Sequence, residues 1–280
     1  MKDDRNEHVL ISLSKRYPQL LLPIDASTPS SEEYKSAVLR GNPLHREPDF
    51  SLSDDDWLRI FETPAGKVEV LFLSERSDFE HALRALAYRC TPREIPSSVG
   101  ASTLIGLSNW EKIHTHKRQY LLSGGTDWSA EFRRFTAEKS NYQDIIILLS
   151  NGPYSAVPGS QLGLPEDQWL EKSLTIRCYH ELTHFVCRKL YPDDIEAIRD
   201  EVLADLMGVL AAFGRIDVDL VRLFLEIGNY QRDNGRLSYY ASPDKMAEAI
   251  ETAEYWLAIY ADRMKKESIT HTLDLITKVF

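Results

Sequence analysis

Two histidines and a glutamate stand at a spacing that suits metal chemistry. Residues His180-Glu181-Leu182-Thr183-His184 form a His-Glu-x-x-His motif. On a helix, residues four apart lie on one face, so the two imidazoles can take two corners of a tetrahedral zinc site. Glu181 projects beside them and can accept a proton from a water whose pKa the metal lowers. The motif therefore predicts a zinc ion on His180 and His184, with Glu181 as the general base.

The helix around the motif is apolar on most sides. Its polar side chains form one narrow stripe, which consists of Ser173, Arg177, His180, Glu181, His184 and Arg188. A mostly buried helix with one narrow polar stripe is typical of a helix that lines a cleft. The stripe therefore indicates that the motif faces a site and that the rest of the helix is packed.

A third protein ligand is expected one helix later. A turn at 191–194 follows the motif helix, and the next helix carries Glu201 and Asp205. If the helices form an antiparallel hairpin, His184 lies seven residues before the turn and Glu201 seven residues after it, each roughly 10 Å away. The same count places His180 level with Asp205. Glu201 is thus predicted to complete the metal site, and Asp205 to hydrogen-bond the outer nitrogen of a ligating histidine.

Several other residues are candidates for parts of such a site. Asp205 or Glu196 would replace Glu201 if the hairpin had another register. Candidates for stabilising the transition state are Tyr239, Tyr240, Tyr230 and His271. A buried tyrosine with a satisfied hydroxyl is the more common interpretation of any one tyrosine.

Two further sets of residues allow a metal interpretation. If 114–116 is extended, His114 and His116 lie on one side and could form a second metal site, although solvent-facing histidines are more common. Cys178 and Cys187 flank the motif and could ligate as thiolates, but their spacing also fits core packing.

Strand patterns come early in the chain and helix patterns late. We expect strands at 67–74, 119–123 and 144–150, the last covered on both faces, and a loop at 91–106. Early helices are expected at 77–90 and 128–139, and a short one is expected to begin at residue 57. Later helices are expected at 166–190, 194–213, 217–228 and 243–266, with Gly208 permitting a close helix approach. This order predicts an α+β fold, a small sheet followed by a mainly helical half.

The composition excludes several classes of protein. The chain has 280 residues and a formal net charge of −10, which disfavours nucleic acid and anionic membranes as partners. Its apolar runs are too short for a membrane span, and its N-terminus lacks the apolar stretch of a signal peptide. Three cysteines fit a reducing compartment, so a cytoplasmic location is expected. The oligomeric state is not readable from these features.

The motif and the later acidic pair resemble the gluzincin (thermolysin-like) branch of the zincin metallopeptidases. In that branch, His-Glu-x-x-His is followed one helix later by a glutamate ligand and often by an aspartate four residues beyond, the pattern of Glu201 and Asp205. The resemblance covers about 166–214. It implies a zincin-like active-site helix where the sheet meets the helical half, and a peptide or protein substrate.

The resemblance extends weakly to 144–154, where such proteins place an edge strand that pairs with the substrate. Asn151 and Gly152 are accordingly candidates for substrate contact. The implied organisation is an N-terminal extension of uncertain role at 1–60 and a zincin-like metallopeptidase domain at 61–280. Two other functions stay open: a zinc hydrolase of a non-peptide amide or ester, and a metal-binding or regulatory protein without turnover.

Overall fold

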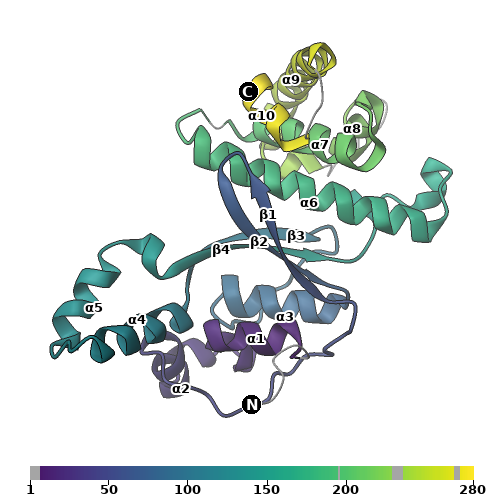
Figure 1. Ribbon diagram of the computed structural model, residues 1–280. Helices are drawn as coiled ribbons and strands as arrows, with labels where there is room; N and C mark the ends of the chain where they lie inside the picture. The colour runs from purple at the N-terminus through teal and green to yellow at the C-terminus, as the bar shows by residue number, and fades with distance from the viewer. Residues whose placement is uncertain (1–6, 195, 229–235, 268–271) are drawn as a thin grey trace. The chain divides into compact units, whose positions relative to one another are not determined.

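The computed structural model describes residues 7–194, 196–228, 236–267 and 272–280 (Figure 1). The chain divides into two compact units. The first comprises Met1–Arg59, Glu69–Pro96 and Ser102–Ser150, and the second comprises Ile60–Val68, Ser97–Ala101 and Asn151–Phe280. The stretch whose role the sequence left open, before residue 60, thus belongs to the first unit. Every residue of the predicted metal site belongs to the second.

A four-stranded sheet has the order β1-β2-β4-β3. Its strands are β1 (Trp57–Thr63), β2 (Gly66–Leu73), β3 (Ala101–Ser108) and β4 (Gln143–Ser150). β2 and β4 are parallel, with Glu69 opposite Ile146. In β4, residues 146–149 are fully buried, as expected for a strand covered on both faces. Because β4 lies inside the sheet, the expectation of an edge strand at 144–154 is wrong.

The helices of the first unit are α1 (Val9–Arg16), α2 (Glu32–Tyr34), α3 (Arg76–Ala87), α4 (Trp110–Leu122) and α5 (Trp128–Thr136). Short helical turns are η2 (Pro18–Leu21), η3 (Thr28–Ser30), η4 (Lys35–Leu39) and η5 (Lys139–Asn141). α3 packs on β4. The hydroxyl of Tyr17, which follows α1, donates to Asp144 at the start of β4 and ties the two elements together.

Three of the elements predicted for residues 57–123 are wrong. Residues 57–61 are a strand instead of a helix, because they pair in a hairpin whose turn is closed by Thr63 Oγ1 donating to Gly66 O (2.6 Å). Residues 119–123 end helix α4, which Asn109 caps by accepting from Lys112 N (3.1 Å). The expected loop at 91–106 runs into β3.

The second unit is helical, as predicted. Its helices are α6 (Glu166–Leu190), α7 (Ala197–Phe213), α8 (Val218–Leu225), α9 (Met246–Lys266) and α10 (Ile276–Val279). Its short turns are η6 (Tyr154–Ala156), η7 (Gly159–Leu162), η9 (Arg236–Tyr239), η10 (Pro243–Lys245) and η11 (Thr272–Leu275). α7 begins three residues later than expected, because the Glu196 side chain caps it by accepting from Ile198 N (3.3 Å). The fold class is therefore α+β, as the sequence predicts.

The pairing of α6 with α7 dominates the second unit. Gly208 permits it, since a Cβ there would lie 2.8 Å from Ile176 O on α6. The predicted close approach at Gly208 is thus confirmed. None of the helices in the described part of the chain combines the length and apolar character that a membrane span needs.

Candidate metal centre

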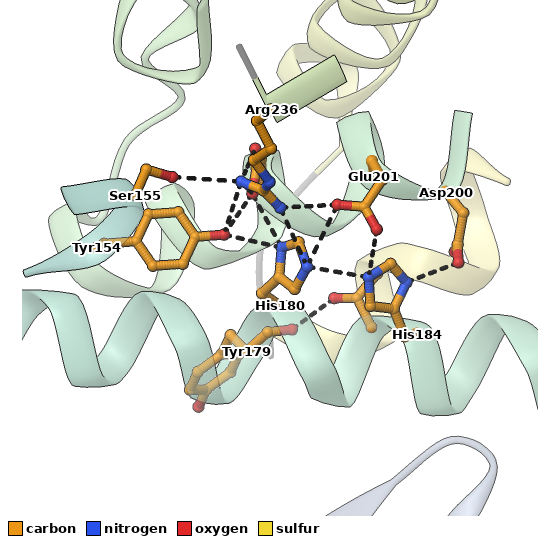
Figure 2. A network of polar contacts seen from close by, with 10 residues as sticks. Tyr154, Ser155, Tyr179, His180, His184, Asp200, Glu201 and Arg236 are labelled. Atoms are coloured by element: carbon orange, nitrogen blue, oxygen red, sulfur yellow. Dashed lines mark hydrogen bonds and ion pairs between the residues drawn. The ribbon is translucent and has the colours of Figure 1, made fainter. Parts of the chain in front are cut away.

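His180 and His184 project from successive turns of α6 toward Glu201 on α7 (Figure 2). The two Nε2 atoms lie 2.9 Å apart. Glu201 Oε1 is 3.2 Å from His184 Nε2, and Oε2 is 3.6 Å from His180 Nε2. One donor atom from each residue lies within 4.8 Å of the others, and all three residues are buried. This group could hold a metal ion.

Each imidazole is hydrogen-bonded at Nδ1, the nitrogen away from Glu201, to an aspartate of α7. His180 Nδ1 lies 2.9 Å from Asp205 Oδ1, and His184 Nδ1 lies 2.6 Å from Asp200 Oδ2. A carboxylate only accepts hydrogen bonds, so both Nδ1 atoms carry their protons and donate. A neutral imidazole held in this way has its Nε2 lone pair toward Glu201, which is the tautomer that metal ligation requires.

The donor set fits a cation between the three ligands. Two imidazole lone pairs at 2.9 Å repel one another unless a proton or a metal ion lies between them. Burial lowers the pKa of His184, but the hydrogen bonds that it donates to the Asp200 and Glu201 carboxylates outweigh burial and raise the pKa to about 10. The site thus attracts positive charge at the point where the three ligand atoms converge.

The surrounding charges lead to the same conclusion. The buried carboxylates are those of Asp200, Glu201 and Asp205. The guanidinium of Arg236 forms ion pairs with the last two. Burial raises the pKa of Glu201, but Arg236 and the two histidines more than offset this, so Glu201 stays ionised. Three carboxylates and one guanidinium leave two negative charges when the histidines are neutral. A divalent cation would balance them, as buried charges require.

Arg236 comes from η9 and contacts both acidic residues of the predicted set. Its Nη2 donates to Glu201 Oε2 (2.7 Å), and its Nη1 lies 3.0 Å from Asp205 Oδ2. Its own backbone N–H donates to Glu226 Oε2 (3.0 Å). Arg236 was not predicted from the sequence, because nothing in the local pattern around residue 236 links it to α7.

Tyr154 is a second residue that the sequence analysis missed. Its hydroxyl donates to Asp205 Oδ1 (2.6 Å) and lies 3.0 Å from His180 Nδ1. Figure 2 shows Tyr154 on the His180 side of the cluster and Asp200 on the His184 side. Asp200 was also missed, because the hairpin count paired His184 with Glu201, the residue that follows Asp200.

The chain matches the model of a family described as "Family of unknown function (DUF7005)" over residues 1–272. The chain belongs to this family. No curated protein and no solved structure matches it significantly. The match to the DUF7005 model includes all of the residues that form the candidate metal centre.

The remaining predicted residues of this DUF7005 member lie around the cluster. Glu181 follows His180 on α6 and is half-buried. Tyr239 is 67 % exposed and has no place in the cluster, whereas Tyr240 is 38 % exposed. Burial of the Tyr240 hydroxyl and the nearby Glu201 carboxylate raise the pKa of this tyrosine. Tyr240, and not Tyr239, is therefore the member of the predicted pair that lies near Glu201.

The other candidates fall outside the cluster. Asn151 is exposed, and the carbonyl of Gly152 accepts from Arg177 Nη1 (2.6 Å) on α6. Tyr230 and His271 lie outside the described residues. The 114–116 segment is helical and not extended: His114 contacts Gly41 O, and His116 contacts Glu131. Cys178 and Cys187 are buried and free of disulfides.

Proposed function

We propose that this protein is a zinc-dependent hydrolase and that its substrates are peptides. The observation that carries the proposal is the pair of imidazole Nε2 atoms directed at Glu201, each histidine held from behind by a buried aspartate. Two nitrogens and one carboxylate oxygen form a typical ligand set of catalytic zinc, which keeps a fourth position open. The peptide substrate rests on the resemblance of the motif and the later acidic pair to gluzincins.

The contacts of the histidines and carboxylates suggest their roles, and the role of Glu181 rests on its place in the His-Glu-x-x-His motif. His180, His184 and Glu201 would hold the metal, while Asp200 and Asp205 would keep the imidazoles in the ligating tautomer. When bound, zinc supplies a Lewis acid and lowers the pKa of water. Glu181 would accept a proton from the attacking water and pass it to the leaving amine.

Purified protein is expected to hold about one zinc per chain, and Glu201→Gln is expected to lose most of it. Glutamine keeps the size of the side chain but removes the negative charge that a zinc ligand contributes here. Elemental analysis after dialysis against metal-free buffer measures this. Glu69→Gln is the matched control, because Glu69 is a half-buried, ion-paired glutamate of the first unit, bound to Arg16. A wild-type protein without zinc after reconstitution would contradict the proposed function.

Asp205→Asn is expected to weaken zinc binding by about 10- to 100-fold without abolishing it. The amide oxygen can still accept from His180 Nδ1, but it lacks the charge that makes the imidazole a stronger ligand. A competition titration with a chromophoric chelator gives the dissociation constant. Asp144→Asn serves as the control, since Asp144 is a hydrogen-bonded aspartate on β4 that accepts from Asn109 and Lys112. Unchanged affinity in Asp205→Asn would remove Asp205 from the metal site.

A further inference from the structure

The backbone of residues 151–156 has positive φ angles at three positions. Gly152 has φ 128°, and the next turn places Ser155 at φ 50° and Ala156 at φ 56°. Residues with a Cβ rarely adopt positive φ, and two consecutive ones cost conformational free energy. Such strain is retained only where surrounding contacts hold the segment in place, so those contacts indicate what the loop is for.

The contacts that hold this loop come from α6. Ser173 Oγ accepts from Tyr154 N (3.0 Å). Arg177 donates through Nη1 and Nη2 to the two carbonyls that precede Tyr154, at 2.6 Å and 2.8 Å. Ser173, Arg177 and His180 share one face of α6, because they are four and three residues apart. The polar stripe that leads along α6 to His180 is thus used to hold the loop.

The result of this anchoring is the placement of one hydroxyl. Tyr154 is buried, and its ring packs edge-on against Phe224, with centroids 4.9 Å apart. The hydroxyl donates to Asp205 Oδ1 at 2.6 Å and lies 3.0 Å from His180 Nδ1. Figure 2 shows Tyr154 and Glu201 on opposite sides of His180.

We propose that Tyr154 is a positioning residue that holds Asp205 on His180, and that loop 151–156 is anchored on α6 for this purpose. The inference rests on the proposed metal site. Asp205 is also contacted by Arg236, whose Nη1 lies 3.1 Å from Oδ1 and 3.0 Å from Oδ2. The Tyr154 hydroxyl fixes Oδ1 beside His180 Nδ1. Without the Tyr154 hydroxyl, the Asp205 carboxylate keeps its contacts with Arg236 but loses the donor that fixes Oδ1 beside the imidazole. The partner that sets the orientation of His180 is then less firmly held.

The test is Tyr154→Phe, which removes the hydroxyl and keeps the ring. We expect zinc affinity to fall by about 10- to 100-fold, and the visible absorption spectrum of the Co²⁺-substituted protein to change in position or intensity. A purely structural role of the hydroxyl would leave the Co²⁺ spectrum as in wild type. Tyr17→Phe is the matched control: Tyr17 is also buried and its hydroxyl also donates to an aspartate, Asp144, but in the first unit. This control is expected to bind zinc as wild type does.

The outcomes separate this inference from the function on which it rests. If wild type binds zinc and Tyr154→Phe binds it equally well with an unchanged Co²⁺ spectrum, the positioning role is overturned while the metal site stands. If wild type binds no zinc, both fail. If Tyr154→Phe does not fold, Ser173→Ala replaces it, since this variant removes only the hydroxyl that anchors the Tyr154 backbone. A smaller loss of zinc affinity in Ser173→Ala supports the inference, and wild-type affinity overturns it.

Discussion

Replacing Glu181 by glutamine is expected to lower kcat for peptide hydrolysis by about 10²- to 10⁴-fold, the usual contribution of a general base. Zinc content should stay at about one ion per chain, because Glu181 is not among the three grouped ligands. Glutamine has nearly the size of glutamate but cannot accept the proton of the attacking water. Loss of turnover with retained metal would therefore separate catalysis from metal binding. Steady-state kinetics on a peptide library, with elemental analysis of the same samples, makes the measurement.

The control for this variant is Glu171→Gln, an exposed glutamate on the same helix, two turns before the motif. It should hydrolyse peptides at the wild-type rate. Turnover by Glu181→Gln at the wild-type rate would show that another group takes the proton. If zinc-loaded wild type does not hydrolyse peptides but hydrolyses esters or other amides, the proposed hydrolase activity stands and the proposed peptide substrate is wrong.

The cluster of His180, His184 and Glu201 could be predicted from sequence because it depends on two regular features. A helix places residues four apart on one face, and two helices joined by a short turn bring equal distances from the turn to one level. These rules predicted that His184 lies beside Glu201 and His180 beside Asp205, and the structure has both contacts. They held although α7 starts at Ala197 and not at 194. The later start of α7 changed little, because α6 and α7 still pack against one another.

Tyr154 and Arg236 could not be predicted in this way. They are 82 residues apart and meet at Asp205 through tertiary packing, which no local periodicity encodes. The strand prediction at 119–123 failed for a related reason. Its apolar residues Leu121 and Leu122 are exposed at the end of α4, so their apolar character does not indicate burial in a sheet. Patterns of burial were informative where the chain packs regularly and uninformative at the ends of elements.

Zinc is expected to raise the melting temperature of the wild-type protein by roughly 10 °C and to leave His184→Ala nearly unchanged. Free zinc at about 1,000 times its dissociation constant stabilises a folded protein by about 4 kcal/mol, and each kcal/mol shifts the midpoint by about 2–4 °C in a domain of this size. His184 supplies one ligand and pairs with both Asp200 and Glu201. Its loss should abolish tight binding, and thermal unfolding with and without zinc measures the difference.

The same variant should also be less stable without metal. Removing one partner of a buried ion pair leaves its carboxylates without a counter-charge, which typically costs about 3–5 kcal/mol. His116→Ala is the control, because His116 on α4 also pairs with a carboxylate, that of Glu131, at 2.6 Å. It should keep the full zinc-dependent shift. A wild-type shift in His184→Ala would mean that zinc binds elsewhere, whereas loss of the shift in His184→Ala alone would tie metal binding to the α6–α7 pair.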